Sequence, residues 1–258
     1  MLTVACIQVS LAADADQLLA LAAFLDKGTP SPRIGDLYIM PQAIWPAQHN
    51  KNRAVRILTS SSQSLRASRV ALAAVCDVAA AVWHGAARNG LALVRPPGHH
   101  ADCSHSRGFC VFNNVGAAAR LLLSRGAKRI LIVDWDVHHG DGTENMFYCD
   151  PAVLCVSIHR YDNGSFYPRS GHPNRCGDGD GLGYNINVAL NGKGYGDADY
   201  MLIFDQVVLP VARAFNPEIV LVSCGFDAGR GDPLGEFDVT ALGYAGMTKR
   251  LMSLADGK

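Results

Sequence analysis

The chain has 258 residues, 49% of them hydrophobic, which fits one large α/β domain with a substantial core better than two small domains. The formal net charge is zero and Lys and Arg form no dense run, so direct binding of nucleic acid or of a membrane surface is not expected. No stretch of about 20 apolar residues exists and the N-terminus lacks a basic region, so neither a transmembrane helix nor a signal peptide is expected.

The eight cysteines form no C-x-x-C pair, which argues against a zinc ribbon or a thioredoxin-like motif. A chain of this size also has no need of disulfide bonds, so a reducing, intracellular setting is expected. The sequence shows no obvious signal that would choose between nucleus and cytoplasm.

The first 60 residues show the least regular pattern of the chain. The stretch 18–25 is compatible with a helix, and the Thr-Pro-Ser-Pro segment at 29–32 indicates a loop. Residues 64–87 then predict a long, Ala-rich helix.

Beyond residue 90, strand-like and helix-like segments alternate. The predicted strands are 91–95, 130–136, 153–159, 184–190 and 219–226. The predicted helices are 114–123 with a cap at Asn113 or Asn114, a helix from Asp197 toward Phe215, and a helix from Thr240 to near Gly257. This alternation predicts βαβ units and a mainly parallel sheet, in which active sites lie at the carboxyl ends of strands.

The strongest chemical signal is the segment 134–142, which reads Asp-Trp-Asp-Val-His-His-Gly-Asp-Gly. It follows an apolar strand, and on an extended backbone Asp134, Asp136 and His138 would point the same way. Three such polar groups are costly to bury unpaired, and a bound cation removes that cost. The alternative, an exposed loop with a few acids, fits the apolar lead-in poorly.

The segment 223–229, Ser-Cys-Gly-Phe-Asp-Ala-Gly, also ends an apolar strand and offers Asp227 as a third ligand. One imidazole and two carboxylates form the open, three-ligand arrangement of a catalytic zinc, which polarises carbonyls and lowers the pKa of water. Fe(II) or Mn(II) would accept the same ligands. The alternative is that Asp227 only caps a turn.

The third signal is Arg-Pro-Pro-Gly-His-His at 95–100, which places two adjacent histidines after a rigid turn. A lone histidine is more often a core or surface residue, but a pair beside a predicted metal site favours general acid–base work. Each imidazole needs an orienting carboxylate, and Asp134 and Asp141 are available for that task.

These motifs, with Gly-Phe-Cys-x-Phe-Asn-Asn, Ser-Ile-His-Arg-Tyr and Gly-Phe-Asp-Ala, together resemble the class II (Hda1-like) histone deacetylases. The resemblance covers about residues 88–255. It implies the arginase–deacetylase α/β fold, a mainly parallel sheet with helices on both faces. It also implies a zinc ion held by Asp136, His138 and Asp227, and a structural K⁺ near Asp134, Asp136, His138, Ser157 and Ile158.

By the same resemblance, His100 is the general base that takes a proton from the attacking water. His99 is its electrostatic or acid partner. Asp134 orients His99, and Asp141 orients His100.

The resemblance also assigns the walls of an acyl-lysine tunnel. Gly108 and Phe109 line one wall, and Tyr167, within the segment 166–168, supplies the other. The family more often has Phe at that place, so the tunnel is expected to be slightly more polar here. Relatives specialised for acetylated polyamines carry a Glu where this chain has Leu234, so acyl-lysine in a protein is the expected substrate.

The last catalytic strand of the family ends in Gly-Gly-Tyr, or in Gly-Gly-His in some class II members. The tyrosine stabilises the developing oxyanion. This chain ends at Lys258 without such a segment, and residues 1–60 match the family poorly, so a truncated catalytic domain is expected. Because the resemblance places that strand inside the sheet, we expect exposed apolar surface and unpaired backbone groups on its neighbours. Poor folding and a rate about 10²–10³-fold lower are therefore expected.

The leading interpretation is a zinc-dependent hydrolase that removes acetyl groups from lysines of histones or other proteins, as a chromatin and transcription regulator in the nucleus or cytoplasm. A corepressor complex is a possible partner. One alternative is a catalytically impaired, truncated form that acts as a binding module. Another is a dinuclear manganese ureohydrolase, which would need more bridging carboxylates than the motifs supply.

Overall fold

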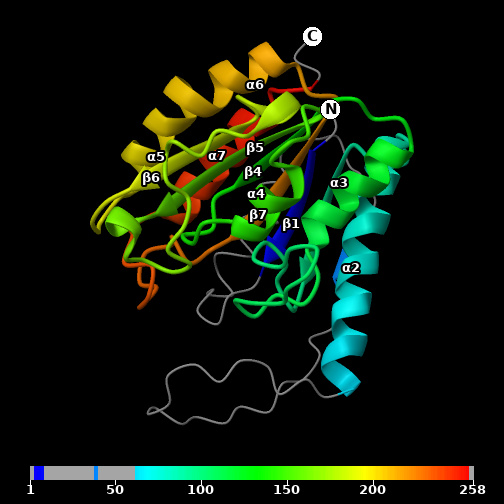
Figure 1. Cartoon of the computed structure of the whole chain (residues 1–258), viewed down its shortest axis with the longest axis horizontal. Coiled ribbons are helices and arrows are strands. Elements are labelled where there is room, and N and C mark those ends of the chain that lie inside the picture. Colours follow the sequence, from blue (N-terminus) through cyan, green and yellow to red (C-terminus); the bar gives the residue numbers. More distant parts are fainter. Residues whose placement is uncertain (1–2, 9–37, 40–61, 256–258) are drawn as a thin grey trace.

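A computed structural model of the chain describes residues 3–8, 38–39 and 62–255 (Figure 1). Its centre is one parallel sheet of seven strands in the order β2-β3-β1-β7-β4-β5-β6. The strands are β1 (Thr3–Gln8), β2 (Tyr38–Ile39), β3 (Asn89–Val94), β4 (Ile130–Asp134), β5 (Val153–Arg160), β6 (Asn185–Leu190) and β7 (Ile219–Gly225).

Helices cover both faces of this sheet, as the resemblance implied. The helical elements are α2 (Ser62–Trp83), α3 (Asn114–Ser124), α4 (Asp141–Phe147), α5 (Asp197–Ile203), α6 (Leu209–Phe215) and α7 (Ala241–Leu251), a π-helical stretch η3 (Phe204–Val208), and the short 3₁₀ turns η1 (Asp162–Gly164) and η2 (Gly179–Gly181). Among the described helices, none has the length and the hydropathy needed to cross a lipid bilayer.

The strands β4, β5 and β7 are buried along their whole length, which explains their continuous runs of Val, Ile and Leu. On one face, apolar side chains of α2 and α3 pack against the sheet, with Val82 and Leu122 fully buried. In Figure 1 both helices lie on the same side of the sheet.

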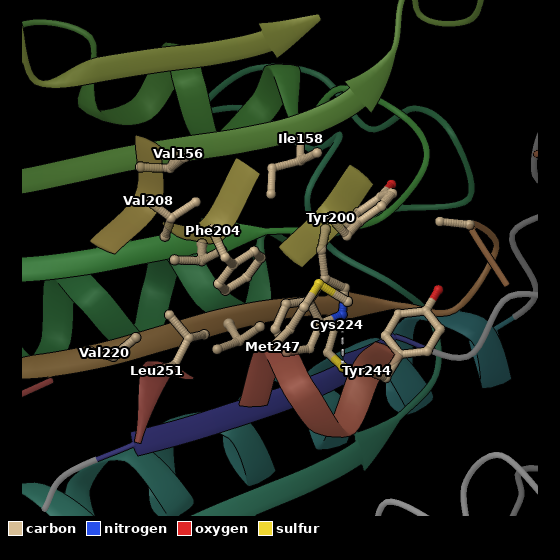
Figure 2. Packing of buried hydrophobic residues seen from close by; sticks show 14 of the residues in the cluster. Val156, Ile158, Tyr200, Phe204, Val208, Val220, Cys224, Tyr244, Met247 and Leu251 are labelled. Atoms are coloured by element: carbon tan, nitrogen blue, oxygen red, sulfur yellow. Dashed lines mark hydrogen bonds between the residues drawn. The ribbon is translucent and has the colours of Figure 1, made fainter. Parts of the chain in front are cut away.

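The opposite face is covered by α5 to α7, whose side chains form a second core. Figure 2 shows Tyr200, Phe204 and Val208 meeting Met247 and Leu251 over the strands. The π-helical stretch η3 connects α5 to α6, so the single predicted helix from Asp197 to Phe215 is one helical run of three parts.

Two of the predicted caps are confirmed. The side chain of Asn113 accepts a hydrogen bond from the backbone N–H of Gly116, and that of Thr240 accepts one from Gly243. The last helix ends at Leu251, earlier than the predicted end near Gly257. The predicted helix at 18–25 lies outside the described residues.

The strand β1 is the main departure from the sequence-based picture, which had five strands and none before residue 91. It lies inside the sheet and pairs in parallel with β3 and with β7 over its whole length. Every described strand except the edge strands β2 and β6 is therefore paired on both sides. The expectation of unpaired backbone groups inside the sheet is wrong for this reason.

Candidate active site

Two neighbouring strands bring three metal-competent side chains together. Asp136 and His138 follow β4, and Asp227 follows β7; because these strands pair in parallel, with Asp134 opposite Ser223, both loops leave the same edge of the sheet. The strand β4 ends at Asp134, two residues earlier than predicted, so strand alternation does not set the directions of the later side chains.

We call Asp136, His138 and Asp227 the ligand cluster. One donor atom from each lies within 4.8 Å of the others. The Nδ1 atom of His138 is 3.0 Å from Asp136 Oδ1 and 2.9 Å from Asp227 Oδ2. The backbone N–H of Val137 donates to Asp227 Oδ1 at 2.8 Å. In the described ranges, no second group of three His, Cys, Asp or Glu donors comes as close, so the dinuclear alternative finds no support.

The donor set fits a divalent cation. Both carboxyl groups are buried, and the one imidazole nitrogen between them can donate only one proton. The other donors to these carboxylates are the backbone N–H groups of His138 and Val137, which carry no full charge. Two buried carboxylates that share one imidazole are costly, and a cation bound by oxygen and imidazole nitrogen would offset that cost. One imidazole and two carboxylates suit zinc, with a coordination position left open.

The pKa values of the ligand cluster reflect the same crowding. Burial, and then the negative charge of Asp227, raises the pKa of Asp136 to about 6. Burial acts against the charged form of Asp227, but the hydrogen bond and the positive charge of His138 outweigh it. Burial acts against the charged form of His138 too, but its hydrogen bonds to Asp136 and Asp227 together outweigh it. The pKa of Asp227 therefore falls to about 2, and that of His138 rises to about 10.

Beside the ligand cluster lies the histidine pair, His99 and His100, which follows β3 and the Pro-Pro turn. Their ring centroids are 3.9 Å apart, and both side chains are buried. His99 Nδ1 is 2.8 Å from Asp134 Oδ2, and His100 Nδ1 is 2.8 Å from Asp141 Oδ1. Because an ionised carboxylate only accepts, each Nδ1 carries the donated proton. Each Nε2 is then left for other chemistry, and that of His99 lies 3.8 Å from Asp136 Oδ1.

The two histidines differ in basicity. Burial acts to lower the pKa of both, but the charges of Asp134 and Asp136 outweigh it at His99, whose pKa rises to about 9. His100 has no such excess of acids, so burial and the positive charge of His99 hold its pKa well below the ordinary value. The pair therefore contains one cationic and one neutral imidazole at neutral pH.

Of the expected tunnel residues, Gly108 and Tyr167 lie against His100. The Tyr167 ring meets the His100 ring edge-on at 5.2 Å. A Cβ at Gly108 would collide with the His100 ring, and its φ of 53° suits glycine, so the backbone approaches the imidazole closely. Phe109 and Leu234 are 73% and 69% exposed, so both side chains lie at the surface.

Sequence reasoning missed two arginines near the site. Arg160 lies over the Phe166 ring at 4.5 Å, and that ring stacks on His138 at 5.2 Å. Its guanidinium also binds Asp162 at 2.7 Å and Glu236 at 2.9 Å, which ties the loop after β5 to the loop after β7. Arg160 belongs to a quoted motif, so the motif could have drawn attention to it. The second, Arg107, contacts Asp141 at 3.2 Å and stands in no motif.

A second polar group, the glutamate cluster, lies apart from the ligand cluster. It is built around one carboxylate and consists of Glu144, His139, Arg175, Asn185 and Asn187. Arg175 Nε donates to Glu144 Oε1 at 2.5 Å, and both asparagine Nδ2 atoms donate to Oε2 at 2.8 Å. His139 Nε2 is 3.3 Å away. Burial acts to raise the pKa of Glu144, but these partners lower it to about 2.

Comparison with known proteins gives a consistent result. Residues 40–258 match the family model of the histone deacetylase domain. Histone deacetylase clr3 of Schizosaccharomyces pombe is 50% identical over 203 residues, which are 77% of this chain and 30% of that protein. Histone deacetylase 15 of Arabidopsis thaliana is 49% identical over 199 residues, 77% of this chain and 36% of that protein. The chain thus spans about a third of the length of these relatives.

The fold has a close match among solved structures. The crystal structure of the HDA15 HD domain superposes with a TM-score of 0.78 and 37% sequence identity, over 98% of this chain and 83% of that one. This confirms the arginase–deacetylase fold that the motifs implied.

Proposed function

The chain belongs to the histone deacetylase family, to the class II branch that its motifs indicated, and on this premise we propose that it removes acetyl groups from lysine side chains of proteins. The proposal treats residues 1–258 as a single catalytic domain. The observation that carries it is the ligand cluster of two acids and one imidazole, directly beside a buried histidine pair with its own carboxylates.

In this proposal Asp136, His138 and Asp227 hold one zinc ion. Zinc bound there would supply Lewis acidity toward an amide carbonyl and make a nearby water more acidic. A structural K⁺ near Asp134 and Ser157 is proposed as well; these residues lie opposite each other in the paired strands β4 and β5.

The protein groups then have separate tasks. His100, kept neutral, accepts the proton of the attacking water, and His99, kept cationic, stabilises negative charge and offers a proton to the leaving amine. Asp134 and Asp141 fix the direction of each ring through Nδ1. Both histidines are almost fully buried, which strengthens the electrostatic interactions of the site and excludes bulk water.

The substrate class follows from the walls of the site. Gly108 and the Tyr167 ring both lie against His100, and in this proposal the acyl-lysine chain reaches the site along these two residues. Leu234 offers no carboxylate for a cationic polyamine, which favours acyl-lysine. Histone tails or other acetylated proteins are the proposed substrates, in nucleus or cytoplasm, with a corepressor complex as a possible assembly.

The test is the turnover of an acetyl-lysine peptide by the purified, zinc-loaded chain. Wild type should release lysine, His100→Ala should not, and Arg120→Ala should match wild type. Arg120 is a suitable control because it binds Asp150 and the carbonyl of Met146, away from every site residue named above. Equal turnover by wild type and His100→Ala, or binding of the peptide with no turnover at all, would contradict the proposal.

A further inference from the structure

Arg107 contacts the backbone of His100 and the carboxylate that pairs with the His100 ring. It immediately precedes Gly108, and its side chain is 38% exposed. Its guanidinium meets three acceptors: Nε donates to the His100 carbonyl at 3.1 Å, Nη2 to Asp102 Oδ2 at 3.1 Å, and Nη1 lies 3.2 Å from Asp141 Oδ2. One planar side chain thus joins the loop at 102–107 to both His100 and its carboxylate.

The contact with Asp141 completes the bonding of that carboxylate. Its Oδ1 accepts from His100 Nδ1 at 2.8 Å and from the backbone of Gly142 at 3.0 Å. Its Oδ2 faces Arg107, and the carboxyl group is only 6% exposed. Without the guanidinium, a buried carboxylate oxygen would lose its charged partner, and the carboxyl group could turn or take up a proton.

We propose that Arg107 is a positioning residue for the deacetylation reaction: it fixes Asp141 and the backbone of His100 together, so that the His100 imidazole keeps its direction. The inference rests on the proposed function. His100 is held at two points by the same guanidinium, at its own carbonyl and at its ring through Asp141. An arginine presents separate N–H groups to these acceptors in a fixed, planar geometry, which the single nitrogen of a lysine does not provide.

The competing view is that Arg107 forms only a surface ion pair with Asp102. Such pairs contribute about 0–1 kcal/mol, and their loss would leave the reaction unchanged. Asp102 is held independently, because its Oδ1 already accepts from the backbone N–H groups of Ser104 and His105 at 2.8 Å. The loop therefore keeps a local structure of its own when the guanidinium is removed, and the two views make different predictions.

The first experiment measures kcat and KM of Arg107→Ala, Arg107→Lys and Arg120→Ala with an acetyl-lysine peptide. Arg107→Ala should lower kcat about 10-fold, as expected for a residue that orients a functional side chain through another residue, and should leave KM nearly unchanged. Guanidinium ion at non-denaturing concentration should restore part of the kcat of Arg107→Ala. The kcat of Arg107→Lys should be lower than that of wild type, and the kcat of Arg120→Ala should match wild type. An unchanged kcat in Arg107→Ala, or a loss that guanidinium does not reverse, overturns the inference.

A second measurement separates this inference from the proposed function. The Nδ1 proton of His100 in its hydrogen bond to Asp141 should give a downfield proton resonance, identified by its loss in Asp141→Leu. Arg107→Ala should shift this resonance and guanidinium should move it back, while Arg120→Ala should not change it. If wild type turns over no acetyl-lysine but the resonance shifts as described, the proposed function fails and the positioning stands. An unmoved resonance overturns the positioning.

Discussion

The ligand cluster and the glutamate cluster both contain buried carboxylates, and both begin in the segment that follows β4, yet their carboxylates are paired in opposite ways. In the glutamate cluster one carboxylate is surrounded by hydrogen-bond donors of Arg175, Asn185 and Asn187, and by His139 at 3.3 Å. In the ligand cluster two carboxylates share one imidazole nitrogen. The protein satisfies the first group by itself and leaves the second short of positive charge, which distinguishes a structural buried acid from a metal ligand.

The largest difference between the two regions should appear in catalysis. His100→Ala removes the proposed general base and should lower kcat about 10²–10⁴-fold. Glu144→Gln, in the glutamate cluster, should leave the kcat of the folded protein close to that of wild type. Steady-state kinetics with an acetyl-lysine peptide, corrected for the folded fraction, measures both. A comparable loss of kcat in Glu144→Gln would contradict the assignment of a purely structural role to the glutamate cluster.

Stability should respond in the opposite order. Glu144→Ala leaves two buried asparagines and the half-exposed Arg175 without their acceptor, so the free energy of unfolding should fall by about 1–3 kcal/mol. Denaturant titration measures the change, with Arg120→Ala as a surface ion-pair control that should cost at most about 1 kcal/mol. An equal decrease in the free energy of unfolding for both variants would show that the glutamate cluster stabilises the fold no more than a surface ion pair does.

The pH dependence of stability sharpens the same point. The pKa of Glu144 falls from 4.5 to about 2 on folding, so the folded state favours the ionised form. Its contribution, about 3 kcal/mol, is complete above pH 4.5 and is lost as the pH falls toward 2. Wild type should therefore lose more stability than Glu144→Gln over this window, as followed by thermal unfolding at each pH. Parallel pH profiles for the two proteins would contradict the account.

The smallest expected effect has the reverse sign. Asp136→Asn removes one of two mutually repelling acids from the ligand cluster, so the metal-stripped protein should gain about 1 kcal/mol in its free energy of unfolding. The same variant should lose zinc affinity and turnover. Denaturant titration in the presence of a chelator measures the gain. A destabilised variant would show that the protein itself satisfies this carboxylate.

Much of this arrangement could be predicted from the sequence, because both the strands and the site motifs are local. Continuous apolar runs predicted β4, β5 and β7. Asp136 and Asp227 follow the carboxyl ends of β4 and β7, and this position predicted that the two residues lie close together. Strand β1 was missed because a six-residue segment flanked by no clear turn or helix signal is not distinctive. Its place between β3 and β7 depends on pairing with strands more than 80 residues away, which no local pattern reports.

The arginine contacts were missed for a related reason. The carboxylates that Arg107 and Arg160 contact, Asp141 and Glu236, belong to segments far along the chain from each arginine. A long, flexible arginine side chain does not indicate from the sequence which carboxylate it will contact. No local pattern separates Glu144 from the acids of the site either, since its donors come from Arg175, Asn185 and Asn187, more than 30 residues along the chain.

The central claim is that Asp136, His138 and Asp227 together hold one zinc ion, and the zinc content of purified protein tests it most directly. Wild type should bind about one zinc per chain, Asp227→Ala should retain almost none after dialysis, and Glu144→Gln should retain the wild-type amount. Zinc bound equally well by Asp227→Ala and wild type would contradict the claim.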